Sequence, residues 1–191
     1  MSPTTETVVL LDDDGARIGT ADKASVHTAD TQLHLAFSCH VIDSEGRLLM
    51  TRRALSKKTW PGVWTNSVCG HPGPDESFED AIRRRAEFEL GLTVTDVELV
   101  LPDFRYRAVD ASGIVENEIC PVYTARTCDV PLPNPDEVMD VAWIRPEDLH
   151  HVVAVAHWAL SPWLVEHAAD LSLAMLAGDA AAPAPPPAGR P

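Results

Sequence analysis

The sequence predicts an α/β fold, a layered sandwich in which helices pack on a mixed β-sheet. Segments with the two-residue period of a strand are interspersed along the chain with segments that have the 3.6-residue period of a helix. No internal repeat is present, and with 191 residues, 45% of them hydrophobic, the chain suits a single domain with an ordinary core.

The first third of the chain is predicted to be mostly extended. A short strand at Thr7–Leu11 leads into an acidic turn at residues 12–15 and a second extended piece near Ile18. Residues 33–42 alternate and are expected to form one strand with a single buried face, joined through the turn DSEG to RLLMTRR as a hairpin. The buried face holds Leu33, Leu35, Phe37, Cys39 and Val41, and the opposite face holds His34, Ala36, Ser38 and His40.

A helix is predicted from residue 76 to residue 90, and it places charges where its buried face should be apolar. Arg85 and Glu89 fall at the centre of the apolar arc and should point inward. An inward carboxylate is costly unless it is paired or coordinates a cation, so an Arg85–Glu89 ion pair and a metal site are both open. The arc contains Phe78, Ala81, Ile82, Ala86, Phe88 and Leu90, and the solvated side contains Glu76, Glu79, Asp80, Arg83 and Glu87.

The second half of the chain predicts three more strands and two helices. Residues 97–109 and 114–126 are expected to form strands around the turn DASG, and Val138 to Ile144 another. Pro146 is expected to open a short helix, and residues 161–176 the last one. The domain is therefore predicted to span residues 1–177, followed by an Ala/Pro-rich disordered tail at 178–191 with no assigned function.

Charge and composition limit the classes of partner. A formal net charge of −14 argues against nucleic acid. The few cations are clustered, in TRRALSKK and in Arg83–Arg85, which favours either a small anionic ligand or a solvated basic face. The N-terminus has no signal-peptide or membrane-anchor pattern, and the four cysteines, Cys39, Cys69, Cys120 and Cys128, have no CxxC spacing. These features predict a cytoplasmic protein without a membrane partner.

Two carboxylates and three histidines form the candidate site. Glu116 and Glu118 lie two apart in a predicted strand and project from one face, which is unfavourable unless both face water, a cation lies between them or one is protonated. With His27, His34 and His71 they offer a mixed N/O ligand set that suits Mn²⁺, Zn²⁺ or Fe²⁺ better than Ca²⁺. The remaining histidines, His40, His150, His151, His157 and His167, have no such neighbours in the pattern and are left out.

Residues 70–92 resemble the signature box of the Nudix family, G-x5-E-x7-R-E-U-x-E-E-x-G-U, where U is aliphatic. The matching positions are Gly70, Glu76, Arg84, Ala86, Glu89, Gly91 and Leu92. Arg85 and Phe88 replace two glutamates that Nudix hydrolases use to hold the Mg²⁺ ions of diphosphate hydrolysis. The resemblance therefore implies a protein that binds a diphosphate but reacts elsewhere on its substrate.

Longer motifs resemble the type I isopentenyl-diphosphate Delta-isomerase family of the Nudix superfamily. They are HTADTQLHLAFS, TRRALSKK, WPGVWTNSVCGHP, DFRYRA and GIVENEICP. The resemblance implies a Nudix-like α/β/α sandwich that isomerises isopentenyl diphosphate to dimethylallyl diphosphate for isoprenoid precursor biosynthesis. It implies one Mn²⁺ or Zn²⁺ and one Mg²⁺ that arrives with the substrate. The first would be held by His27, His34, His71, Glu116 and Glu118, and the second by Glu89 and the backbone carbonyl of Cys69.

The same resemblance implies the remaining roles. Protonating an unactivated alkene needs a strong, well-placed acid, a base for the neighbouring carbon and shelter for a tertiary carbocation. Cys69, Glu118 and Tyr106 would transfer the protons, although Cys69 and Tyr106 also suit a plain apolar core. Lys23, Arg53, Lys57 and Arg84 would contact the phosphates, and Trp64 and Trp163 would offer π faces, with a core role also open for Trp64.

Two rival functions remain at this point: a Nudix hydrolase and a non-catalytic binding module. The missing box carboxylates and a cysteine beside the Glu/His set count against the hydrolase. The expected partner is a small-molecule diphosphate, and the expected oligomeric state is a monomer.

Overall fold

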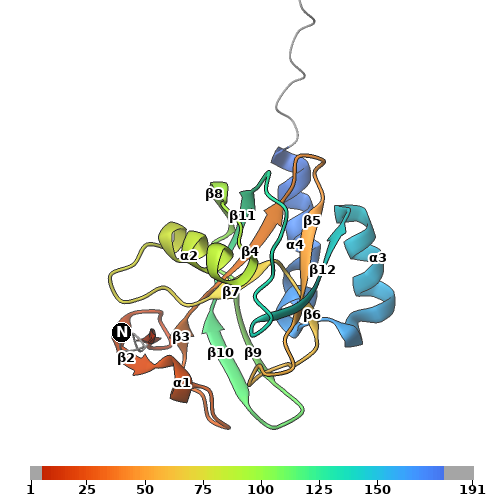
Figure 1. Cartoon of the computed structure of the whole chain (residues 1–191). Coiled ribbons are helices and arrows are strands. Elements are labelled where there is room, and N and C mark those ends of the chain that lie inside the picture. Colours follow the sequence, from red (N-terminus) through yellow and green to blue (C-terminus); the bar gives the residue numbers. More distant parts are fainter. Residues whose placement is uncertain (1–5, 179–191) are drawn as a thin grey trace, which may run out of the picture.

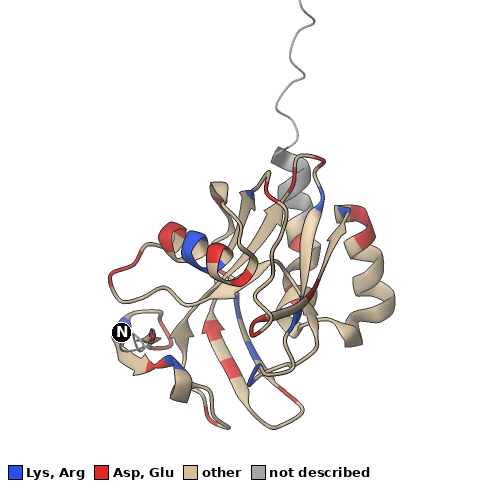
Figure 2. Ribbon diagram, in the orientation of Figure 1, with Lys and Arg blue, Asp and Glu red and all other residues tan. Residues whose placement is uncertain are grey.

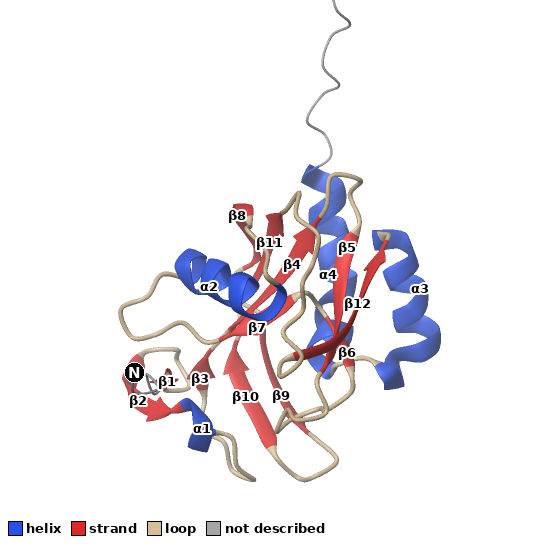
Figure 3. Cartoon of the chain, in the orientation of Figure 1, coloured by secondary structure: helices blue, strands red, loops and turns tan. Residues whose placement is uncertain are grey.

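The computed structural model describes residues 6–178. Two β-sheets meet at the centre of the molecule, and helices cover both sides of the larger sheet (Figures 1 and 3). The disordered tail predicted at 178–191 lies outside the described residues, apart from Gly178, the last residue of helix α4. Within the described range, no helix has both the length and the apolar character needed to cross a membrane.

The larger sheet has seven strands and is mixed. Its main path runs β12-β5-β4-β11-β8, with β6 added to β5 and β7 added to β4. Only β4 and β11 are parallel; the other pairs are antiparallel. The strands are β4 (Phe37–Ile42), β5 (Leu48–Arg53), β6 (Trp64–Thr65), β7 (Val68–Gly70), β8 (Thr95–Leu101), β11 (Val122–Arg126) and β12 (Val138–Ile144).

The smaller sheet has five strands in the order β2-β1-β3-β10-β9. Here β3 and β10 are parallel, and the register places His34 opposite Glu118. The antiparallel pair β9–β10 places Tyr106 opposite Glu118 as well. The strands are β1 (Thr7–Leu11), β2 (Arg17–Asp22), β3 (His34–Leu35), β9 (Arg105–Val109) and β10 (Val115–Ile119).

Each of the three long strands predicted from the sequence is broken into two, and its halves lie in different sheets. Residues 33–42 divide at Ala36, 97–109 divides after Leu101, and 114–126 divides at Cys120 and Pro121. Proline lacks the N–H that a central strand donates, which explains the break at Pro121. At Ala36 the alternation continues across the break, so the pattern did not reveal it.

The prediction that residues 33–42 have a single buried face was also wrong. All six residues of β4 are buried. One face packs on α2 through Phe37, Cys39 and Val41, and the opposite face packs on the side of α3 and α4. A strand covered by helices on both sides is buried on both sides whatever its alternation.

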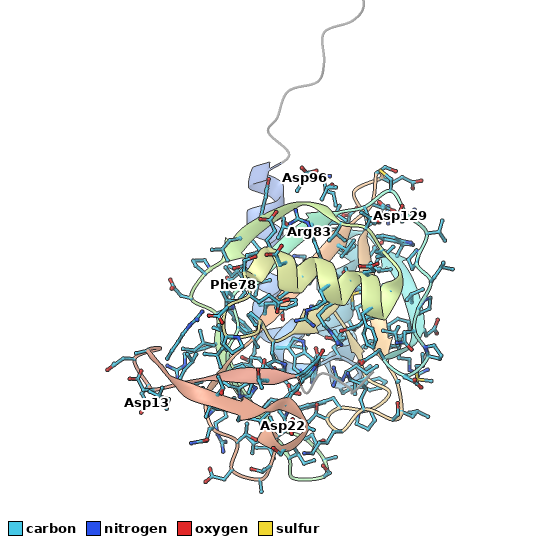
Figure 4. The ribbon with its side chains drawn as sticks, turned by 60° about the vertical axis from the view of Figure 1, so that its left-hand side comes forward. Asp13, Asp22, Phe78, Arg83, Asp96 and Asp129 are labelled. Carbon is cyan, nitrogen blue, oxygen red and sulfur yellow. The ribbon has the colours of Figure 1, made fainter. Side chains whose placement is uncertain are left out.

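The helices agree well with the sequence patterns. Helix α2 (Phe78–Leu90) starts two residues later than predicted because Ser77 is its N-cap and accepts from the Asp80 N–H at 3.1 Å. It ends at Gly91, whose φ of 63° favours glycine. Figure 4 labels Phe78 near its beginning and Arg83, which is exposed. The others are α1 (Lys23–Val26), which was not predicted, α3 (Pro146–Ala156), a 3-10 turn (His157–Ala159) and α4 (Pro162–Gly178).

Two histidines that the sequence pattern left without neighbours form a buried pair. His40 on β4 and His167 on α4 are both fully buried, with 3.0 Å between their Nε2 atoms. The ring of His167 also packs edge-on against Phe104. Burial lowers the pKa of both rings, to about 3 for His167, so both are neutral in the folded protein.

This pair predicts a loss of stability in mild acid. Below pH ~6.5 the unfolded histidines take up protons that the folded ones cannot, so the free energy of unfolding falls by about 1.4 kcal/mol per pH unit for each ring. The free energy of unfolding continues to fall until the pH reaches the pKa of the histidines in the folded protein. Urea unfolding at pH 7 and pH 5 measures this change in the free energy of unfolding.

His167→Leu should lower that pH slope by about one ring's share. The matched change His151→Leu, at an exposed histidine of α3, should leave the slope at its wild-type value. Equal slopes in the wild type and in His167→Leu would show that His167 is not held neutral.

Candidate active site

One cavity of about 780 Å³ brings together side chains from both sheets and from helices α1, α2 and α4. The acidic bands on β10 in Figure 2 correspond to its two glutamates. Of the residues expected from the sequence, those that line this cavity are Lys23, His27, Arg53, Lys57, Cys69, His71, Tyr106, Glu116, Glu118 and Trp163. Four others, His34, Trp64, Arg84 and Glu89, are not among its lining residues.

Three imidazoles surround one carboxylate oxygen of Glu118. The Nε2 atoms of His71, His34 and His27 lie 3.1, 3.3 and 3.9 Å from Glu118 Oε1. One ligand atom from each of these four residues lies within 4.8 Å of the others. The pattern-based expectation that these residues gather in space is therefore met for His27, His34, His71 and Glu118.

The nitrogens in this cluster are suited to hold a divalent cation. His34 Nδ1 lies 2.8 Å from the carbonyl oxygen of Gln32, an acceptor, so Nδ1 carries the hydrogen and the lone pair of the neutral ring is on Nε2. The Nε2 atoms of His27 and His34 are buried without a hydrogen-bond partner. Lone pairs that face a carboxylate oxygen are unfavourable unless a proton or a cation lies between them, and three nitrogens with an oxygen suit a divalent metal.

The charges in the cluster are strongly perturbed. Burial alone would raise the pKa of Glu118, but the three neighbouring imidazoles outweigh it and hold the pKa well below its usual range. Burial lowers the pKa of His71 to about 4. The Glu118 carboxyl is therefore ionised among the imidazoles of His27, His34 and His71.

Tyr106 joins the two glutamates of β10. Its hydroxyl oxygen lies 2.7 Å from Glu116 Oε2 and 2.9 Å from Glu118 Oε2. A phenol has one proton, so both contacts are hydrogen bonds only when one carboxyl also carries a proton. Burial first and then the charge of Glu118 raise the pKa of Glu116, so Glu116 takes up a proton more readily than Glu118. Glu116 also accepts from Thr59 Oγ1 at 2.6 Å.

Cys69, on β7, is held in the cavity wall by polar neighbours. Its sulfur lies 3.2 Å from Asn66 Nδ2, 3.3 Å from Asn66 Oδ1 and 3.6 Å from Ser38 Oγ. Burial raises the pKa of the thiol to about 11, whereas these contacts and the charge of Arg53 lower it. Sequence reasoning missed Asn66 and Ser38, because neither residue type stands out from its position.

Trp163 forms an aromatic wall, whereas Trp64 does not reach the cavity lining. Trp163 is buried, and its Nε1 donates to Asn66 Oδ1 at 3.0 Å. The Arg53 guanidinium lies over its ring at 5.6 Å. Trp64 is half-buried and packs against the core cluster on the α3 and α4 side, which is the structural role left open for it.

Three of the cations that line the cavity, Lys23, Lys57 and Arg85, are paired with carboxylates. Lys23 Nζ lies 2.5 Å from Glu6, and Lys57 bonds to Glu137. Arg85 is buried and lies 2.9 Å from Glu89 through its Nε, so the ion pair that the helix pattern left open is present. Arg85, Glu6 and Glu137 all line the cavity.

Arg84 lies at the edge of this group and is not among the residues that line the cavity. It bonds to Glu76 at 2.7 and 2.8 Å and to Glu6 Oε1 at 3.3 Å, and it is more exposed than Arg85. Its neighbour Arg85, in contrast, lines the cavity. Sequence reasoning singled out Arg85 as inward-facing but assigned it no ligand.

The fold has relatives among solved structures. A crystal structure from Deinococcus radiodurans has a TM-score of 0.65 at 21% identity, covering 86% of this chain and 98% of that one. The MutT protein of Methanosarcina mazei Go1 has a TM-score of 0.56 at 15% identity, covering 78% of this chain and 96% of that one. At these identities the likeness concerns the fold alone. The NUDIX domain matches residues 32–164, which defines the class as a Nudix protein and confirms the predicted sandwich.

Relatives with higher sequence identity define the family within the Nudix class. The isopentenyl-diphosphate Delta-isomerase of Agromyces mediolanus is 70% identical over 160 residues, which cover 84% of this chain and 78% of the relative. That of Clavibacter michiganensis subsp. michiganensis (strain NCPPB 382) is 61% identical over 186 residues, covering 93% and 96%. The chain therefore belongs to the type I isopentenyl-diphosphate Delta-isomerase family within the Nudix superfamily.

The histidine cluster predicts tight binding of one divalent transition-metal ion. His27→Asn should weaken Zn²⁺ or Mn²⁺ binding by at least about tenfold, because it removes one nitrogen from the set. His151→Asn, on the exposed surface of α3, is the matched control and should bind like the wild type. Metal content after dialysis against a competing chelator reports the difference, and equal retention in both variants would contradict a role for His27.

Proposed function

We propose that this protein isomerises isopentenyl diphosphate to dimethylallyl diphosphate, a step in isoprenoid precursor biosynthesis. One observation carries the proposal beyond family membership. Two separate groups that can transfer protons line the same cavity. One is the hydrogen-bonded set of Tyr106 with the two glutamates of β10, and the other is the thiol of Cys69. Moving a double bond requires adding a proton at one carbon and removing another from its neighbour, so two such groups are the minimum set.

The proton donor is proposed to be Glu118 with Tyr106. The extra proton of the Glu116, Tyr106 and Glu118 cluster is shared along two short hydrogen bonds, so it can reach Glu118 without crossing water. Burial raises the pKa of Tyr106 far above its usual range, and the phenol therefore stays neutral and relays the proton. Adding this proton to the terminal alkene carbon leaves a tertiary carbocation.

Cys69 is proposed to accept the proton from the neighbouring carbon. The thiol must first ionise, and the donors Asn66 and Ser38 together with the charge of Arg53 favour the thiolate. In the reverse direction the two groups exchange roles. Trp163 supports the cation between the two steps, because its ring faces the cavity and excludes water. Trp64 is assigned a packing role.

Two metal ions complete the proposed site. His27, His34, His71 and Glu118, with Glu116 as the expected fifth ligand, would hold a Mn²⁺ or Zn²⁺. Glu89 and the Cys69 carbonyl would hold a Mg²⁺ that comes with the diphosphate. The ions would supply electrostatic stabilisation to the ionised carboxylate and to the phosphates.

The diphosphate is proposed to bind Lys23, Arg53, Lys57 and Arg85, all of which line the cavity. Arg84, expected in this set from the box, is proposed instead to orient Glu76. Because every assigned group lies on one chain, the proposed active form is a monomer. The net charge of −14 supports a small-molecule partner over nucleic acid. The cytoplasmic location remains a prediction from the sequence.

The test follows the label in the product. The purified protein is incubated with isopentenyl diphosphate and Mg²⁺ in D₂O and analysed by NMR. We expect dimethylallyl diphosphate that carries solvent deuterium, because the donor group exchanges with water. Release of phosphate would indicate a hydrolase, and no change in the substrate would indicate a binding module; either result contradicts the proposal.

In the same assay Cys69→Ala should lower kcat by about 100-fold or more, the usual effect of losing an acid or base, and leave bound metal unchanged. Cys128→Ala, at an exposed cysteine, is the control and should keep wild-type activity. If Cys69→Ala keeps more than about a tenth of the wild-type kcat, the acid/base role of Cys69 is wrong.

A further inference from the structure

Glu137 is an acidic residue in a cavity that is expected to bind an anion. It precedes β12, lines the cavity and is half-buried, with 17% of its side chain exposed. The sequence pattern gave it no role. A carboxylate at this place opposes the binding of a diphosphate by simple charge, so its presence needs a reason.

One oxygen of Glu137 contacts two cations from different elements. Its Oε2 accepts from Lys57 Nζ and lies 3.4 Å from Arg85 Nη2. Lys57 comes from the loop after β5, and Arg85 comes from α2. Burial would raise the pKa of Glu137, but the charge and hydrogen bond of Lys57 and then the charge of Arg85 lower it, so the carboxylate is ionised.

The main chain around Glu137 is fixed to both of these elements. Ala54 N donates to Glu137 O at 3.0 Å, and Ser56 Oγ donates to Asp136 O at 3.1 Å, which joins this segment to the loop that carries Lys57. Asn134 N donates to Glu89 O at 2.8 Å, which joins it to the end of α2. The carboxylate therefore extends from a backbone held on both sides.

Two neighbouring cations repel each other. Arg85 is buried and also paired with Glu89. In contrast, Lys57, on a long flexible side chain, would move toward solvent if Glu137 did not hold it. A carboxylate oxygen that contacts both cations reduces their repulsion and orders their side chains before the ligand binds. Such preorganisation lowers the free-energy cost of binding.

We propose that Glu137 is a positioning residue that holds Lys57 and Arg85 in the arrangement that binds the substrate diphosphate. The proposal rests on the proposed function only in the identity of that ligand. The alternative is that Glu137 merely balances charge.

The two possibilities predict opposite changes in the affinity of Glu137→Gln for an anion. If Glu137 only balances charge, Glu137→Gln removes a repulsion and strengthens binding of an anion, and Glu137→Asp changes little. If Glu137 positions the cations, Glu137→Gln weakens binding because the charged acceptor is lost. Glu137→Asp then weakens it as well, because the side chain is one methylene too short to contact both cations.

The experiment titrates inorganic pyrophosphate with Mg²⁺ into each folded variant by calorimetry and measures KM and kcat for isopentenyl diphosphate. We expect pyrophosphate to bind about tenfold more weakly to Glu137→Gln and at least about threefold more weakly to Glu137→Asp. KM should rise in parallel while kcat stays within about threefold of wild type. Glu79→Gln, which removes the partner of exposed Arg83 on the same helix α2, is the matched control and should change neither.

Tighter pyrophosphate binding by Glu137→Gln would overturn the proposal, as would affinities within about twofold of wild type in both variants. If Glu137→Gln does not fold, Glu137→Asp decides alone, since charge balance predicts no loss for it. If the wild type forms no dimethylallyl diphosphate, the proposed function fails, but the pyrophosphate titration still decides the role of Glu137.

Discussion

The ionised carboxylate of Glu118, buried among three imidazoles, is the constraint on which the rest of the site depends. A charge removed from water is costly unless partners surround it. His27, His34 and His71 provide those partners on one oxygen, and Tyr106 provides one on the other. The three imidazoles hold the pKa of Glu118 low, whereas burial and the charge of Glu118 raise the pKa of its neighbour Glu116. We propose that this difference places a proton on Glu116, which Tyr106 passes to Glu118.

The histidines and Glu118 come together because the chain passes from one sheet to the other between consecutive strands. Strand β3 pairs with β10 before the chain moves to the other sheet as β4, so His34 and Glu118 stand side by side in register. Strand β7 then pairs with β4 and carries Cys69, and His71 is the first residue after this strand. The breaks in the strands thus allow residues of both sheets to meet at one cavity.

Much of this arrangement could be predicted from the sequence, and the rest could not for identifiable reasons. The box helix, its inward Arg85 and Glu89, and the cluster of His27, His34, His71 and Glu118 follow from spacing and resemblance. The strand breaks do not, because the alternation of apolar and polar residues continues across Ala36. Such a pattern indicates a strand but does not show to which sheet each part belongs. The contacts of Asn66 with Trp163, of Glu6 with Lys23 and of Glu137 with Arg85 do not follow from the sequence either, because these partners lie far along the chain. Such contacts leave no local pattern.

The central claim is that one metal ion and the proton-transfer cluster share Glu118. The most direct measurement is anomalous diffraction at the manganese edge from crystals grown with Mn²⁺. The account predicts a single strong peak between the Nε2 atoms of His27, His34 and His71 and the Glu118 carboxylate, within about 2.0–2.3 Å of its ligands. A peak elsewhere, or none among these four residues, would contradict it.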